Sequence, residues 1–152
     1  MQVYCTERVE QALKREYHYI FNNDQYPGIP KVNLNRITKE TPIVLNNLHI
    51  TPIEVMHYKL PVLGFRIGDF TYITDAKTVA EEEKQKIKGS KTLIVNALRE
   101  QEHLSHFNLE EALAFIEEEL PATDERDEIV TFIRDSGRGV IKRFGKGVVE
   151  ED

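Results

Sequence analysis

Two pairs of apolar runs, each joined by a two-residue turn, constrain the fold of this chain more than any other feature. The stretch 41–57 (TPIVLNNLHITPIEVMH) places Asn-Asn between β-prone runs, and the stretch 62–75 (VLGFRIGDFTYITD) places Gly-Asp between two more. Short turns of this kind between β-prone runs are a strong signal of β-hairpins. With the alternating run 32–37 (VNLNRI) before them, they predict antiparallel strands over most of the region from 32 to 75.

Helical patterns flank these strands. A short β-prone run over 2–5 precedes a helix predicted over 7–21, which Thr6 caps. Apolar residues recur in this helix at helical spacing and predict one buried face; they are Val9, Leu13, Tyr17 and Ile20.

The second half of the chain alternates between helix and strand. A short charged helix (80–88) stops at Gly89, and the near-continuous apolar run 91–98 predicts a buried strand. Two helices follow, over 108–120 and 125–136. Asn108 and Glu111 form a capping box at the first of them, and its predicted buried face consists of Leu109, Ala112, Leu113 and Ile116. The predicted fold class is therefore mixed α/β, with helices against a sheet.

Composition excludes several classes of protein. The chain of 152 residues has 40% hydrophobic residues, enough for a domain with a core, but no apolar run that would span a membrane. Its start lacks the pattern of a secretory signal, so a cytoplasmic location is expected. The single cysteine, Cys5, excludes an internal disulfide and a multi-cysteine zinc cluster, and it is expected to be buried. The net charge of −6 argues against nucleic acid as a partner.

Four residues are candidates for chemistry. His57 and Asp75 each follow an apolar strand, and His103 and His106 share a loop at i, i+3 spacing. Side chains in loops at strand ends can gather at one rim of a sheet, where active sites occur. Structural alternatives are a helix cap for Asp75, an exposed strand end for His57 and a polar loop for the His103–His106 pair. The chain has no glycine-rich phosphate loop and no G-x-S-x-G elbow.

The run from His57 to Asp75 (H-Y-K-L-x-x-x-G-F…Y-I-T-D) resembles the metallo-β-lactamase fold hydrolases, in particular the branch of cyclic-phosphate phosphodiesterases. The run 96–118 (NALREQEHLSHFNLEEALAFIEE) is similar to the same branch. This resemblance implies that His57 binds a metal ion, that Asp75 bridges two, and that His106 is a general acid for the leaving oxygen. It implies a divalent metal, zinc or manganese, and a small phosphodiester substrate.

The chain departs from that family in its metal ligands. The family's H-x-H-x-D-H motif does not occur, and the expected late histidine is missing from the sequence after His106. We therefore expect a partial αββα sandwich over 1–118, lacking the N-terminal half, with weak or no activity. A non-catalytic binding module derived from that fold is the alternative.

The last part of the chain has a resemblance of its own. From about residue 118 onward, it is similar to the C-terminal helical end of the UDP-N-acetylglucosamine acyltransferases, although the chain has no hexapeptide repeat. We expect residues 119–152 to be an appended helical tail of different origin. An acyltransferase fragment is a third hypothesis and depends on this tail alone. A half sandwich would leave an apolar face or a strand edge uncovered, so a homodimer is an expected assembly, with poor solubility as the alternative.

Overall fold

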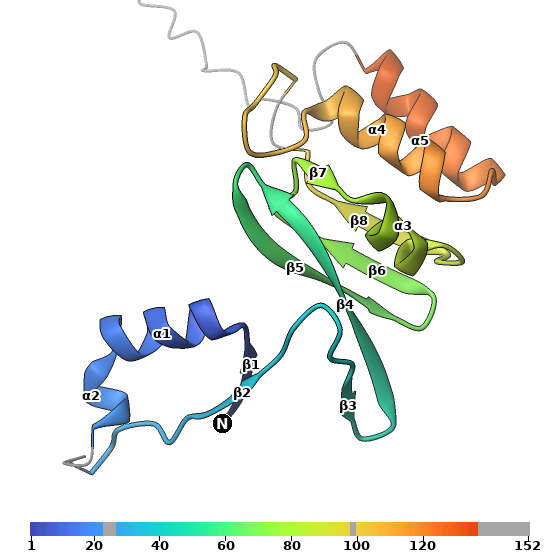
Figure 1. The fold of residues 1–152 in the computed structure, drawn as a ribbon. Coiled ribbons are helices and arrows are strands. Elements are labelled where there is room, and N and C mark those ends of the chain that lie inside the picture. Colours follow the sequence, from blue (N-terminus) through green and yellow to red (C-terminus); the bar gives the residue numbers. More distant parts are fainter. Residues whose placement is uncertain (23–26, 98–99, 137–152) are drawn as a thin grey trace, which may run out of the picture. The chain divides into compact units, whose positions relative to one another are not determined.

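The computed structural model describes residues 1–22, 27–97 and 100–136 (Figure 1). It divides into two compact units, residues 1–120 and 121–152, and each is described by itself. The helices and strands of the first unit are, in chain order, β1 (Gln2–Cys5), α1 (Glu7–Glu16), α2 (His18–Phe21), β2 (Asn33–Arg36), β3 (Ile43–Leu45), β4 (Leu48–His57), β5 (Leu60–Ile67), β6 (Phe70–Ile73), β7 (Thr78–Val79), α3 (Glu81–Ile87), β8 (Thr92–Val95) and α4 (Leu109–Glu119). In the second unit the described helix is α5 (Asp124–Asp135).

A mixed sheet with the strand order β3-β4-β5-β6-β8 is the centre of the first unit, and β7 pairs with β4. The two predicted hairpins are confirmed. Asn46 and Asn47 turn between β3 and β4 with φ angles of 48° and 70°, as a tight hairpin turn requires, and the turn between β5 and β6 contains Gly68 at φ 58°. A further hairpin, which the sequence did not predict, joins β4 to β5 through Tyr58 and Lys59.

Two pairings are parallel rather than antiparallel. Strand β8 runs parallel to β6, because α3 crosses over between them. Strand β2 is parallel to β1 in a separate two-stranded sheet, with α1 and α2 as the connection. The prediction that the strand at 32–37 joins the antiparallel run was therefore wrong.

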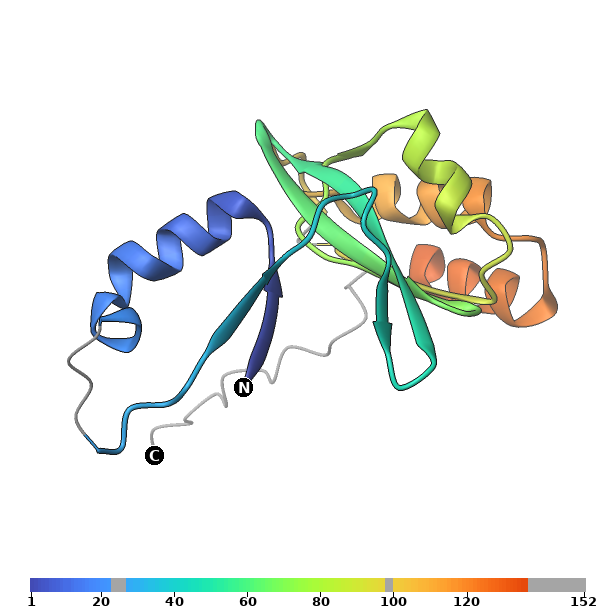
Figure 2. The same ribbon diagram turned by 60° about the horizontal axis from the view of Figure 1, so that its bottom comes forward.

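The hydrophobic core lies between one face of the sheet and the helices α3 and α4 (Figures 1 and 2). Ile53 and Val55 of β4 and Ile73 of β6 pack there against Ile87 of α3 and Phe115 of α4. The packing leaves no room at Gly64 of β5, because a Cβ built there would lie 2.9 Å from Ile73 Cγ1 and 2.9 Å from the carbonyl oxygen of Tyr72.

The N-terminal helical region differs from the prediction. The predicted helix over 7–21 is interrupted at Tyr17, which separates α1 from α2, although Thr6 caps it as expected by accepting from the Val9 amide. The expected buried face is not formed, since Val9 and Tyr17 are exposed. The buried side chain is instead Glu10, which accepts hydrogen bonds from Arg36 of β2 and, at 2.5 Å, from Lys14.

The predicted buried strand at 91–98 was also wrong in part. Strand β8 is at the edge of the sheet, and its residues alternate between exposed and half-buried, with Ile94 47% exposed. The capping box of Asn108 and Glu111 is confirmed at α4. The Gly- and Lys/Arg-rich stretch 137–147 lies outside the described residues.

Candidate functional site

The predicted residues lie where two neighbouring segments of the sheet end, at the C-terminal ends of β4 and β6. His57 is the last residue of β4, and Asp75 lies two residues beyond the end of β6. Both strands are antiparallel to β5, so they run in the same direction and their C-terminal ends lie on the same side of the sheet's strand ends. Tyr58 and Asp75 have positive φ angles of 57° and 53°, a backbone conformation that often marks functional sites. Asp75 is not the cap of the next helix, because the N-cap of α3 is Ala80.

A set of hydrogen bonds around Ala76 holds the loop after β6 against the loop before α4. The Phe107 amide donates to the carbonyl oxygen of Ala76 at 2.7 Å. The Asn96 side chain accepts from the Ala76 amide at 2.8 Å and donates to its carbonyl at 3.2 Å. Asp75 and His106 are the neighbours of Ala76 and Phe107 in the sequence. These bonds therefore bring together two site residues that lie 31 positions apart in the chain.

His106 is at the centre of the site. Its Nε2 lies 3.1 Å from Asp75 Oδ1, and its ring lies edge-on to that of His57, with centroids 4.5 Å apart. The structure thus gathers His57, Asp75 and His106, as the sequence predicted, while their chemical roles stay predictions. Because a carboxylate only accepts hydrogen bonds, the Nε2 atom of His106 must carry the proton in this contact.

The opposite nitrogen of His106 lies in a network with His103 and Ser105. His106 Nδ1 is 3.0 Å from Ser105 Oγ and 3.2 Å from His103 Nδ1. The Ser105 amide donates to His103 Nδ1 at 3.3 Å, which leaves that nitrogen as an acceptor. Neutral His106 accepts from the Ser105 hydroxyl, and protonated His106 donates to Ser105 or His103. His106 can therefore gain or lose a proton at Nδ1 without losing its contact with Asp75.

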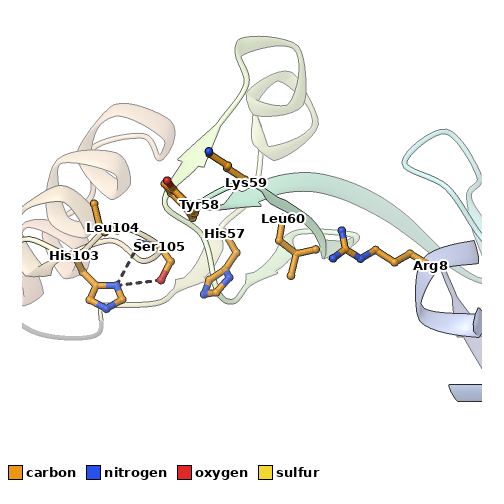
Figure 3. Close-up of a pocket in the computed structure, with 8 residues that line it drawn as sticks. All are labelled: Arg8, His57, Tyr58, Lys59, Leu60, His103, Leu104 and Ser105. Atoms are coloured by element: carbon orange, nitrogen blue, oxygen red, sulfur yellow. Dashed lines mark hydrogen bonds between the residues drawn. The ribbon is translucent and has the colours of Figure 1, made fainter. Parts of the chain in front are cut away.

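A hollow of about 670 Å³ lies beside this network (Figure 3). His57, His103 and Ser105 line it together with two cationic side chains, Arg8 of α1 and Lys59 of the β4–β5 turn. Sequence reasoning missed Arg8, Lys59 and Ser105 as site residues. Ser105 lies within the H-L-S-H run, so its position between two histidines was the available signal. No comparable signal existed for Arg8, which is distant in the chain.

An ion pair next to the site supports the same loops. Lys77, the residue after Ala76, donates to both carboxylate oxygens of Glu111 at 2.7 and 2.8 Å. Burial raises the pKa of Glu111, but hydrogen bonds from the Lys77 side chain and the Asn108 backbone outweigh it and hold the pKa below its usual range. The Glu111 carboxylate is therefore ionised at neutral pH and ties α4 to the loop that carries Asp75.

The metal expected from the resemblance does not fit the donors in this structure. Although His57, Asp75 and His106 lie close together, residues 1–22, 27–97 and 100–136 contain no group of three or more histidine, cysteine or carboxylate side chains with an arrangement that could hold a metal ion. A tetrahedral zinc site with a catalytic water needs three protein ligands, and a two-ion centre needs more. His57 and Asp75 are at most part of such a set.

Helices pack on one face of the sheet, and histidine and aspartate side chains lie at the C-terminal ends of its strands. This arrangement is that of the metallo-β-lactamase fold. Residues 1–122 match the beta-lactamase superfamily domain, and the chain belongs to that family.

Two solved structures share the fold. A diphosphatase of the PhnP family has a TM-score of 0.69 and 26% identity, over 78% of this chain and 42% of that chain. The metallo-β-lactamase fold protein YhfI from Bacillus subtilis has a TM-score of 0.55 and 11% identity, over 86% of this chain and 57% of that one. This chain thus spans about half the length of the solved relatives.

A curated protein is also similar. The octanoyltransferase of Porphyromonas gingivalis (strain ATCC BAA-308 / W83) is 34% identical over 114 residues, which is 74% of this chain but 23% of that protein. More than three quarters of that protein has no counterpart in the match. None of the helices in the described part of this chain is long and apolar enough to cross a membrane.

Proposed function

We propose that this chain carries the general acid of a phosphodiester hydrolase site, and that His106 is this acid. The observation that carries this proposal is the contact of 3.1 Å between His106 Nε2 and Asp75 Oδ1, together with the network at His106 Nδ1. A carboxylate behind an imidazole orients the ring and stabilises its protonated form. The Nδ1 proton of His106 then passes to the Ser105 hydroxyl, which lines the hollow, while the hydroxyl gives its own proton to the leaving oxygen.

The charge of the hollow supports an anionic substrate. Arg8 and Lys59 line it beside the histidines, and a phosphodiester carries the negative charge that these side chains attract. The PhnP-family diphosphatase, with the same fold and 26% identity, supports phosphorus chemistry as the class of reaction.

A divalent metal ion is part of this proposal, but the described residues supply only some of the ligands that it needs. If further donors completed the site, His57 and Asp75 would be two of the ligands of a divalent ion, zinc or manganese, and the ion would supply an activated water. For this reason we expect low turnover from this chain by itself. A cytoplasmic location is proposed with the same function.

The experiment is hydrolysis of a cyclic nucleoside phosphate by the purified chain in zinc, in manganese and in EDTA, because its alkoxide leaving oxygen, unlike p-nitrophenolate, needs a proton in order to leave. We expect slow hydrolysis that needs a metal ion, falls to the buffer rate in His106→Gln and is unchanged in His49→Gln. His49 is a matched control, because it is an exposed histidine near the opposite end of β4. Turnover that His106→Gln does not reduce would show that His106 is not the acid.

The second candidate is a non-catalytic module that binds a phosphodiester. The observation in its favour is that the described residues contain no group of three donors with an arrangement that could hold a metal ion. Binding of the substrate without any turnover, weakened by Lys59→Gln, would favour this module over the hydrolase. Isothermal titration with a non-hydrolysable phosphorothioate diester measures that binding.

A further inference from the structure

The hydroxyl of Ser105 lies within reach of two imidazole rings at the side of the hollow, and Figure 3 shows it next to His103. Ser105 Oγ is 3.0 Å from His106 Nδ1 and 3.2 Å from His103 Nδ1. Neutral His106 carries its proton on Nε2, towards Asp75, so its Nδ1 is an acceptor. His103 Nδ1 is also an acceptor, because the Ser105 amide donates to it. The hydroxyl therefore donates its hydrogen to an imidazole, and its oxygen keeps its lone pairs for an electrophile.

Ser105, His106 and Asp75 make the same sequence of contacts as the catalytic side chains of serine hydrolases, hydroxyl to imidazole and imidazole to carboxylate. The His106 ring joins them through opposite nitrogens, 3.0 Å from the hydroxyl and 3.1 Å from the carboxylate. In the usual triad the hydroxyl faces Nε2 and the carboxylate faces Nδ1, and here the two nitrogens are exchanged. One nitrogen still takes the proton while the other contacts the carboxylate. Such triads occur on unrelated folds and are recognised by their geometry, so a chain without a G-x-S-x-G elbow can have one.

We propose that Ser105 is a nucleophile that cleaves carboxylic esters, a second activity of the same hollow. Ser105 Oγ forms a bond to the carbonyl carbon of the ester, and its proton passes to His106 Nδ1. The bond from that carbon to the leaving oxygen then breaks, and the leaving oxygen keeps the electron pair and takes the proton from Nδ1. Water next attacks the acyl-serine with His106 Nδ1 again as the base. The carboxylic acid leaves, and Ser105 recovers its proton.

The residues that line the hollow indicate the kind of ester. Leu104 and Tyr58 are 76% and 55% exposed, and together with Leu60 they offer apolar surface to an acyl group. Lys59 and Arg8 bring positive charge to the same hollow, which favours the oxyanion of the tetrahedral intermediate. We therefore expect the substrate to be an ester with a short apolar acyl group and no positive charge.

This inference does not rest on the proposed phosphodiester hydrolysis, although both use His106 and Asp75. In that reaction Ser105 passes a proton to the leaving oxygen, whereas here Ser105 Oγ itself attacks the substrate. Attack by a serine oxygen needs no metal ion. The two activities can therefore be separated with EDTA, in which cleavage of an ester continues and metal-dependent hydrolysis of a phosphodiester stops.

The test is labelling of the purified chain in EDTA with a fluorophosphonate, a reagent whose phosphorus is attacked by an activated serine oxygen while fluoride leaves. Peptide mapping by mass spectrometry locates the label, and hydrolysis of p-nitrophenyl acetate in EDTA measures turnover. The variants are Ser105→Ala and His106→Gln. The matched control is Ser136→Ala, because Ser136 Oγ donates to the carbonyl oxygen of Ile133 at 2.7 Å rather than to an imidazole.

We expect the label on Ser105 in the wild type and in Ser136→Ala, with labelling and ester hydrolysis slower by about a hundredfold in His106→Gln. Ester hydrolysis in Ser105→Ala should fall to the buffer rate. Far-UV circular dichroism establishes that each variant is folded, and the map of the labelled wild type decides the outcome even where a variant does not fold. A label on His106, on a lysine or equally on Ser136 would overturn the inference. Absence of any label, or ester hydrolysis that Ser105→Ala does not reduce, would also overturn it.

Discussion

Replacement of Asn96 by alanine tests how the site loops are held together. The side chain of Asn96 accepts a hydrogen bond from the Ala76 amide and donates one to the Ala76 carbonyl. Ala76 is fully buried, so in Asn96→Ala its amide loses its partner away from water. Its carbonyl oxygen keeps the hydrogen bond from the Phe107 amide. A single buried donor is therefore left without a partner, and this costs about 1–3 kcal/mol of unfolding free energy.

Urea unfolding followed by circular dichroism measures this loss. With a slope of about 1–3 kcal/mol per molar urea, the midpoint should fall by roughly 1 M. The matched control is Asn35→Ala, since Asn35 bonds mainly to exposed groups such as the Gln2 side chain, and its loss should stay within about 0.5 kcal/mol. A loss in Asn96→Ala no larger than in the control would refute the reasoning that Asn96 braces this loop.

Three further predictions concern packing, pH and metal. Gly64→Ala should destabilise the chain by about 1–3 kcal/mol in the same urea assay, because the new Cβ would lie 2.9 Å from two neighbouring atoms; an unchanged midpoint would mean that the strands shift freely. Hydrogen bonds from Arg36 and Lys14 lower the pKa of Glu10 from 4.5 to about 2, so its stabilisation is complete above pH 4.5 and is lost as the pH falls towards 2. The difference in urea midpoint between wild type and Glu10→Gln should shrink over that range, and a constant difference would contradict this. Mass spectrometry of protein purified without chelator should find fewer than two metal ions per chain; a stoichiometric pair of ions would disprove this expectation.

Much of the sheet was predictable because its signals are local. The Asn46-Asn47 and Gly68-Asp69 turns need backbone angles that few residues adopt, so the sequence alone places both hairpins. The capping box of Asn108 and Glu111 depends on residues three positions apart, and it too was predictable. The resemblance over His57–Asp75 supplied the family, which the match over residues 1–122 shows.

The sequence did not reveal which long-range contacts build the site. His106 meets Asp75 because Phe107 bonds to Ala76 and Asn96 braces the same residue, and these partners lie 20 or more positions apart. Arg8 and Lys59 come to the same hollow from separate elements, without any local pattern that links them.

Burial was decided by the tertiary structure in the same way. The apolar run 91–98 predicted a buried strand, but β8 is an edge strand with Ile94 exposed. The helix stripe of Val9 and Tyr17 is exposed, while Glu10 is buried beside Arg36. Periodicity shows that a strand or helix has an apolar side, and turn chemistry shows where the chain reverses, since both depend on neighbouring residues. What covers an apolar side, and which polar groups meet at a strand end, depends on contacts between distant segments, and only the folded chain brings those segments together.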